Sequence, residues 1–178
     1  HRSLWPDYIK LKKQINKNNR KSLFSLELKG YNWGLGCNSI HFIHLANFLF
    51  GDQNYNDSFF ELKNINYWKN AKRKLYKEFN GSINIFFKNN SKILLKDKKK
   101  YKNQNFKIIL KIENKKIIID EIKNKIFFNK KKYKFKSETI SGIFSKEIKK
   151  IIIFKKSNLP SLKETYDVHY YFIKNLLI

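Results

Sequence analysis

The chain has 178 residues and a formal net charge of +25 at pH 7, and Cys37 is its one cysteine. This length suits one domain with a single core. One cysteine excludes an intramolecular disulfide and favours a reducing compartment. No apolar run approaches the ~20 residues that span a bilayer, and no signal peptide is visible. We therefore expect a cytoplasmic protein with no membrane partner. The absence of methionine and the first residue, His1, indicate a fragment of a longer protein.

The positive charge comes almost entirely from lysine. Of the 39 basic residues, three are arginine: Arg2, Arg20 and Arg73. Proteins that grip phosphates use arginine heavily, because its planar guanidinium matches phosphate oxygens. An excess of Lys, Asn, Ile, Phe and Tyr is also what AT-rich codons produce. The composition therefore favours codon bias, and we expect no nucleic-acid partner.

A helix and a strand are predicted before residue 30. Pro6 and Asp7 are typical of a helix start, and the helix that follows has an apolar face. In residues 23–28 apolar and other side chains alternate, which predicts a strand. The apolar helix face consists of Tyr8, Leu11 and Ile15.

A glycine-rich segment from Gly30 to Gly36 follows the strand. Glycines allow the backbone to pass close to another group. An apolar helix is predicted to begin near Asn38 and to end at Gly51. Free N–H groups and the positive end of the helix dipole would lie at its start. His41 would lie in the first turn, where a proton-transfer residue would be useful.

Short β-rich runs separated by turn signals fill residues 58–136. Asn80-Gly81 predicts a hairpin that joins residues 72–79 to residues 82–88. Residues 96–102 are predicted to be a solvated basic loop. Short connections favour antiparallel pairing, so we expect a meander of five or more strands. The later predicted strands are residues 92–95, 106–113, 116–120, 125–128 and 133–136.

Two helices are predicted to close the chain. The first spans residues 137–154, and the second begins with a capping box formed by Ser161 and Glu164. The fold class is therefore α+β, an open antiparallel β-sheet with helices packed on one face. No Gly-rich nucleotide loop between a strand and a helix is recognisable. The predicted apolar faces are Ile140, Phe144, Ile148 and Ile151 on the first helix, and Leu162, Tyr166, His169, Ile173 and Leu176 on the second.

The chemistry of the glycine-rich segment has two interpretations from the residues alone. A histidine on an apolar helix is more often a partly buried structural residue than a catalytic one, and Trp33 can equally be a core residue. His41 and His44 could share a helical face as metal ligands. No carboxylate or further Cys/His cluster completes such a site, so we expect no metal.

The segment from Asn32 to His41 reads Asn-Trp-Gly-Leu-Gly-Cys-Asn-Ser-Ile-His. It resembles the C-terminal halves of Gfo/Idh/MocA oxidoreductases, a family named for glucose–fructose oxidoreductase and inositol dehydrogenase. The resemblance is closest to the branch associated with surface-polysaccharide genes. Residues 2–12 resemble the helix that follows the family's Glu-Lys-Pro loop, and residues 159–169 resemble its C-terminal segment. The sheet between about residues 54 and 136 does not match.

The resemblance implies that residues 1–178 are one C-terminal domain for substrate binding and oligomerisation. The Rossmann domain, which would bind most of the NAD or NADP, is absent from this chain, so the fragment alone would be inactive. The implied substrate is a sugar or nucleotide sugar, with a role in surface-polysaccharide biosynthesis. The implied partners are the missing Rossmann half and further copies that associate through the sheet.

The resemblance also implies roles for particular residues. His41 would exchange a proton with the substrate hydroxyl, and no cofactor-binding residue is assigned. Many family members have Asp four residues before this histidine and Asp three residues after it. Cys37 and His44 stand there in this chain, which puts a carboxylate–histidine dyad in doubt. The residues expected to contact the substrate are Asn38, Trp33, Cys37 and Arg2.

Two other function classes stay open. One is a small basic RNA-binding protein of the ribosomal kind, in which aromatic residues between lysines, such as Phe127, Phe128 and Tyr133, would stack bases. The other is a purely structural role, in which the sheet mediates self-association and no active site survives.

Overall fold

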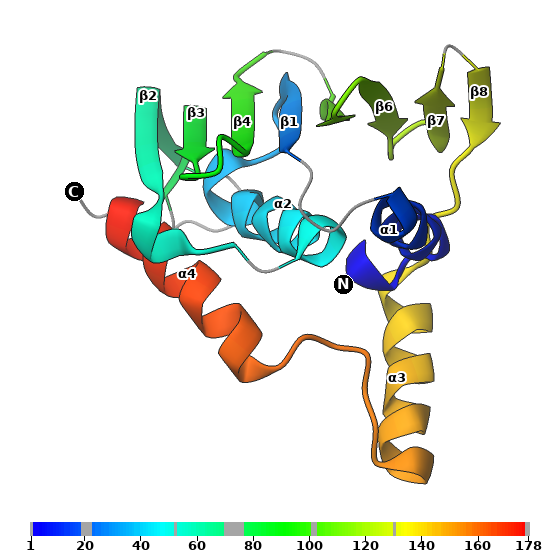
Figure 1. Cartoon of the computed structure of the whole chain (residues 1–178). Coiled ribbons are helices and arrows are strands. Elements are labelled where there is room, and N and C mark those ends of the chain that lie inside the picture. Colours follow the sequence, from blue (N-terminus) through cyan, green and yellow to red (C-terminus); the bar gives the residue numbers. More distant parts are fainter. Residues whose placement is uncertain are drawn as a thin grey trace.

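The computed structural model describes residues 2–18, 23–51, 53–69, 77–100, 103–129 and 131–176. Within them, eight strands form one sheet, and the helices lie on one side of it (Figure 1). The predicted α+β fold class is therefore confirmed. In chain order the elements are η1 (Arg2–Leu4), α1 (Pro6–Asn18), β1 (Phe24–Tyr31), α2 (Leu35–Phe50), η2 (Tyr55–Asp57), β2 (Phe59–Lys69), β3 (Lys77–Phe86), β4 (Lys92–Lys98), β5 (Asn105–Ile112), β6 (Lys115–Asp120), β7 (Lys125–Phe128), β8 (Lys131–Lys134), α3 (Ile140–Phe154) and α4 (Leu162–Leu176).

The first helix and the first strand form as their patterns predict. Tyr8, Leu11 and Ile15 of α1 are all buried, and so are Leu26 and Leu28 of β1. Side chains of one helical face and of alternate strand positions point the same way, which is why these patterns identify the buried face.

Strand β1 lies in the middle of the sheet, and this differs from a simple meander. The strand order is β2-β3-β4-β1-β5-β6-β7-β8. Strand β1 pairs in parallel with β4 and antiparallel with β5. The chain therefore forms two antiparallel groups, β2–β4 and β5–β8, and β1 joins them. Short connections predict antiparallel neighbours within each group, but they do not reveal a strand inserted from earlier in the chain.

The hairpin predicted at Asn80-Gly81 is wrong, and residues 72–76 of its first arm lie outside the described residues. Strand β3 continues through these two residues and pairs antiparallel with β2. The pairing register shifts between Lys63 and Asn66, and a Cβ at position 81 would lie 2.6 Å from the Asn64 carbonyl oxygen. Glycine is therefore required here by a β-bulge instead of a turn.

The basic loop predicted at residues 96–102 is also partly wrong. Strand β4 runs on to Lys98, and Asp97 within it is 1% exposed. Residues 101 and 102 lie outside the described residues. Lysines dominate this stretch of sequence, so the alternation of exposed and buried side chains that indicates a strand cannot be recognised in it.

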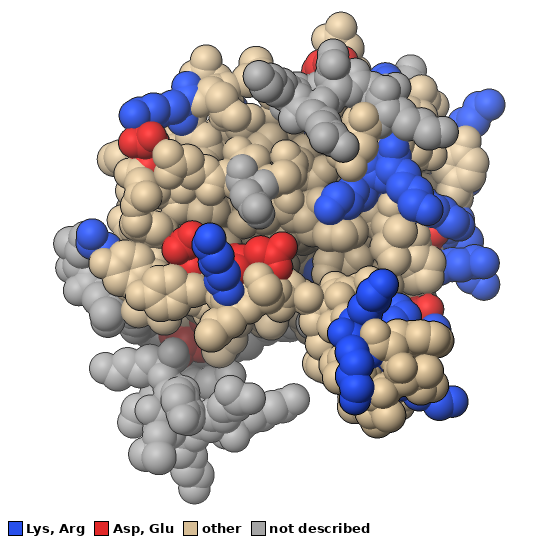
Figure 2. All heavy atoms as spheres, turned by 60° about the horizontal axis from the view of Figure 1, so that its bottom comes forward, with Lys and Arg blue, Asp and Glu red and all other residues tan. Residues whose placement is uncertain are grey.

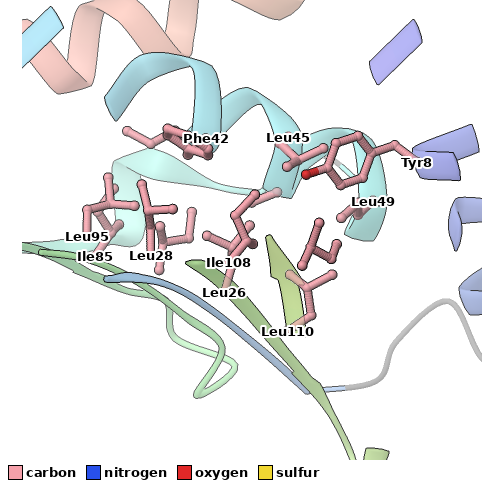
Figure 3. Packing of buried hydrophobic residues seen from close by; sticks show 14 of the residues in the cluster. Tyr8, Leu26, Leu28, Phe42, Leu45, Leu49, Ile85, Leu95, Ile108 and Leu110 are labelled. Atoms are coloured by element: carbon pink, nitrogen blue, oxygen red, sulfur yellow. The ribbon is translucent and has the colours of Figure 1, made fainter. Parts of the chain in front are cut away.

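The core lies between the sheet and α2 (Figure 3). Helix α2 contacts β3 and β4 beneath it, and α1 and α4 on its flanks. It buries Phe42, Leu45 and Leu49 against strand residues such as Leu26 and Ile108. This packing fixes which face of α2 points away from the sheet, and that face carries the candidate site.

Helices α3 and α4 form as predicted, but each buries a different face from the predicted one. Helix α4 buries Val168 and Phe172, whereas Leu162 is 84% exposed. In α3 the buried residues are Ile143 and Glu147. In each helix the buried face is displaced from the predicted face by one residue, which is about 100° around the helix axis. The predicted faces of both helices lie largely in solvent: Phe144, Ile148, Ile151, Leu162, Tyr166, His169 and Ile173 are all exposed.

None of the helices in the described ranges combines the length and the apolar character that crossing a bilayer requires.

Candidate functional site

Helix α2 begins at Leu35, three residues before the predicted start. Two buried carboxylates bind the backbone at its entry. Glu78 of β3 accepts hydrogen bonds from the N–H groups of Gly36 (2.6 Å) and Cys37 (3.1 Å). Asp97 of β4 accepts from the N–H groups of Trp33 (3.3 Å) and Gly34 (2.9 Å).

These contacts correct the expectation that the start of α2 offers free N–H groups to a ligand. Glu78 and Asp97 are 2% and 1% exposed, so protein carboxylates satisfy the helix terminus from the interior. Burial raises the pKa of Asp97, and hydrogen bonds from Gly34 and Trp33 oppose the rise. Because the helix starts early, His41 lies in its second turn instead of its first.

His41 lies on the face of α2 that points away from the sheet, and it lines a cavity of about 750 Å³, here called the His41 pocket. This volume is within the range of small-molecule sites. Arg2, Ser3 and Lys12 form one wall of the pocket, and α2 from Ile40 to Phe48, with Gly51 just after the helix, forms its floor. The opposite wall consists of residues 157–161 and the first turns of α4.

Three histidines meet in the His41 pocket. His41 and His44 are one helical turn apart on α2, and the ring of His169 from α4 lies 5.4 Å from that of His44. Burial, and then the positive charge of Arg2, lower the pKa of His41 to about 4. Burial, and then His169, lower the pKa of His44 to about 4. Both rings are therefore neutral at pH 7 and able to accept a proton or a hydrogen bond.

His44 has an unsatisfied polar atom. Its Nε2 is buried and has no hydrogen-bond partner among the described residues. A buried polar group without a partner costs roughly 1–3 kcal/mol, so such atoms usually have a partner in the functional state. Since His44 lines the His41 pocket, a bound polar molecule can provide that partner.

Arg2 is held rigidly at the edge of the His41 pocket. Its Nε donates to Glu121 at 2.9 Å, and its Nη2 donates to the same carboxylate at 3.0 Å. The Tyr8 hydroxyl donates to Glu121 at 2.7 Å, and burial together with the charge of Glu121 raises the pKa of that hydroxyl. The guanidinium also lies 4.2 Å from the Phe42 ring centroid. Arg2 therefore acts on the pocket as a fixed positive charge.

Of the predicted site residues, the structure brings together Arg2 and His41, and the other three do not line the His41 pocket. Trp33 is 2% exposed, and its indole N–H donates to the Lys96 carbonyl at 3.0 Å. Asn38 donates from its side chain to the Trp33 carbonyl at 2.6 Å. Cys37 is exposed at the start of α2. Trp33 and Asn38 thus stabilise the turn that leads into α2.

Sequence reasoning missed Glu78, Asp97 and Glu121. Glu78 follows a lysine, Asp97 lies between two lysines, Glu121 follows another acid at a turn, and alternation alone does not distinguish a buried carboxylate from an exposed one. Their rarity was a usable signal, because the chain has 14 acidic residues against 39 basic ones. His169 was placed on a helix face, but its proximity to His44 depends on how α4 crosses α2. Nowhere in the described ranges do three His, Cys, Asp or Glu side chains gather closely enough to hold a metal.

Comparison with solved structures finds this fold in a class of oxidoreductases and dehydrogenases. A levoglucosan dehydrogenase in complex with NADH matches at a TM-score of 0.61 and 12% identity, over 90% of this chain and 57% of that chain. A biliverdin reductase from Synechocystis sp., in complex with biliverdin and NADP+, matches at 0.61 and 10% identity, over 97% and 58%. A Gfo/Idh/MocA family oxidoreductase from Vibrio cholerae matches at 0.53 and 10% identity, over 96% and 56%.

The chain thus spans a little over half the length of each of these structures, and what it shares with them is the fold. No protein-family model matches the chain, and no curated protein sequence does.

Proposed function

We propose that this chain is the substrate-binding half of an NAD(P)-dependent oxidoreductase that acts on a hydroxyl group of a sugar or nucleotide sugar. The observation that carries the proposal is the position of His41, which lines a pocket on the helix that covers the sheet. The fold shared with NADH- and NADP+-bound oxidoreductases supports it. A role in surface-polysaccharide biosynthesis, which rests on the resemblance alone, and a cytoplasmic location, which rests on the single cysteine, are parts of the proposal.

His41 is assigned the proton transfer. A neutral imidazole accepts the proton of the substrate hydroxyl during oxidation and returns it during reduction. Burial, and then the positive charge of Arg2, lower the pKa of His41 and keep the ring neutral. His44 Nε2 is available to accept a hydrogen bond from a second hydroxyl, as a polyhydroxylated substrate would provide.

The described residues do not fit a dinucleotide. The glycines before α2 are the nearest match to a phosphate-binding turn, but Glu78 and Asp97 bind their N–H groups and would repel a pyrophosphate. The proposal therefore assigns NAD or NADP to a Rossmann domain outside this chain. The residues of this chain bind and orient the substrate and move its proton.

The surface beside the His41 pocket suits the docking of such a domain. Figure 2, which brings the helix side forward, shows uncharged areas between groups of lysines on that side. Ile152 and Phe154 of α3 are each 65% exposed, and Tyr166 and Ile173 of α4 are at least half exposed. Apolar patches of this kind mark interaction sites.

The test uses the chain joined to its nucleotide-binding half. His41→Asn is expected to lower kcat for sugar oxidation by about 100-fold or more, with a small change in KM, because the group that moves the proton is lost. Lys132→Asn, an exposed replacement on β8 outside the pocket, is expected to change kcat by less than about threefold.

Two results would overturn the proposal. One is unchanged turnover in His41→Asn, which would leave the domain with a structural role. The other is tight binding of NADH or NADPH to the isolated chain, measured by calorimetry, because the dinucleotide would then not need a second domain.

A further inference from the structure

The face of the sheet opposite the helices, here called the open face, carries two rows of lysine. Lys29 of β1 lies directly opposite Lys96 of β4 and Lys107 of β5, which makes the first row. The second row contains Lys92 of β4, then Ser25 of β1, then Lys111 and Lys116 of β5 and β6. The rows are four residues apart along each strand, or about 13 Å.

The lysine rows are electrostatically unfavourable as they stand. Like charges directly opposite each other on neighbouring strands destabilise a sheet, and Lys29 has such a neighbour on both sides. Between the rows, the described residues of β4, β1, β5 and β6 include one carboxylate that can compensate the positive charge of the lysines. It belongs to Glu27, which pairs with Lys29 at 2.5 Å. A polyanion bound across these strands would relieve the repulsion.

The strip between the two rows is mostly apolar. Leu94, Glu27, Ile109, Ile118 and Phe127 are successive cross-strand neighbours from β4 to β7, and all of them are half-buried. A strip with one aromatic ring, flanked by linear arrays of cations, is the arrangement on which single-stranded nucleic acids bind. The phosphates follow the cations, and the bases lie on the apolar surface.

Against the expectation from the composition that the chain has no nucleic-acid partner, we propose that the open face binds single-stranded nucleic acid. A duplex fits less well, because its bases are paired and cannot lie on the strip. The resemblance implies that further copies associate through the sheet, but a second copy fits poorly on this face, because face-to-face packing would bring lysine rows against lysine rows. The arginine deficit speaks against recognition of particular phosphates by bidentate contacts, and it is compatible with binding that ignores sequence.

The test measures the affinity of the chain for a fluorescent oligouridine of about 20 nucleotides, by anisotropy, from about 50 to about 300 mM KCl. If six lysines contact phosphates, the log–log slope of affinity against salt is about −4, since each contact contributes about 0.7. The triple variant Lys29→Gln, Lys96→Gln and Lys107→Gln is expected to reduce that slope by about 2. Oligo(dT) in parallel tells RNA from DNA as the strand bound.

The matched control carries the same loss of charge on the helix side: Lys149→Gln, Lys156→Gln and Lys163→Gln, all of which are exposed. Its slope is expected to stay within about 0.5 of the parent. Equal effects of both triple variants would mean that affinity follows net charge alone, and would overturn the proposal. The proposal would also be overturned if the chain bound vesicles that contain phosphatidylserine more tightly than the oligonucleotide and lost that binding in the open-face variant. A dimer that dissociates in the open-face variant but not in the control would overturn it as well. This test does not involve His41, so its outcome is independent of the oxidoreductase proposal.

Discussion

The two faces of the sheet handle charge in opposite ways. On the helix side, the carboxylates of the core, Glu121, Glu78 and Asp97, are buried and matched by defined partners, whereas lysines such as Lys149 and Lys163 are exposed. On the open face, lysines recur at alternate positions of neighbouring strands, and Glu27 is the one carboxylate between the rows of described residues.

This difference indicates which face of the sheet depends on the identity of particular side chains. A buried ion pair survives only when its geometry is good, because removal from water costs more than an imperfect contact returns. An exposed lysine is tolerated almost anywhere. The helix side therefore carries residue-by-residue constraints, and the open face carries a bulk electrostatic property.

The largest expected effect lies on the helix side. Glu121→Gln should reduce the free energy of unfolding by about 3 kcal/mol, because it leaves the Arg2 charge without its partner in a buried site. Urea unfolding measures this. Glu61→Gln, which breaks the Lys63 pair on the edge strand β2, should leave the unfolding midpoint unchanged. Equal effects of the two variants would remove the contrast between the faces.

A smaller effect should come from the histidines of the His41 pocket. The pKa values of His41 and His44 in the folded chain are about 4, below the ordinary value of 6.5, so the unfolded chain takes up protons first as the pH falls. The stability that they contribute is fully present above pH 6.5 and is lost as the pH falls toward 4. After a discount for their partial exposure, we expect about 3 °C of melting temperature per ring.

Thermal unfolding between pH 7 and pH 4 checks this linkage. His44→Asn should flatten the decline, whereas Lys107→Gln on the open face should leave it as in the parent. A decline of the same size in His44→Asn would show that the pH dependence comes from other groups.

The smallest effect concerns the lysine rows. Lys107→Gln removes one charge opposite Lys29 and should stabilise the chain by about 0.5 kcal/mol at low salt. The gain should vanish in about 1 M NaCl, where the Debye length is roughly 3 Å. A gain that persists at high salt would point to strand propensity as its cause instead of repulsion.

Much of the fold could be predicted from local patterns. The face of α1, the alternation in β1 and the capping box at Ser161 and Glu164 are confirmed, the last by hydrogen bonds of 2.5 and 3.2 Å. The position of β1 between β4 and β5 was not predictable, because pairing between distant strands leaves no trace in a single sequence. The Asn80-Gly81 error has a similar cause, since a bulge and a turn both require glycine.

The candidate site was predictable in part. The segment that contains His41 was identified, but the start of α2 was placed at Asn38 because the acids that satisfy it, Glu78 and Asp97, are far away in sequence. The buried faces of α3 and α4 were displaced by one residue because both helices contain a run of consecutive apolar or aromatic residues, 151–154 in α3 and 170–173 in α4. A pattern that fits several faces cannot choose among them.

The central place of β1 has a consequence for how this protein assembles during translation. Its residues leave the ribosome before their hydrogen-bonding partners in β4 and β5, which follow some 67 to 88 positions later, as the Ser25–Lys92 and Phe24–Ile112 pairings show. Until those strands are made, the backbone N–H and C=O groups on both edges of β1 are unpaired, and apolar segments in this state are prone to aggregate. Without β1, the groups β2–β4 and β5–β8 would not be joined. Because β1 stays unpaired during synthesis, the conditions of synthesis and the supply of chaperones should affect the yield of folded chain more than the stability of the finished fold does.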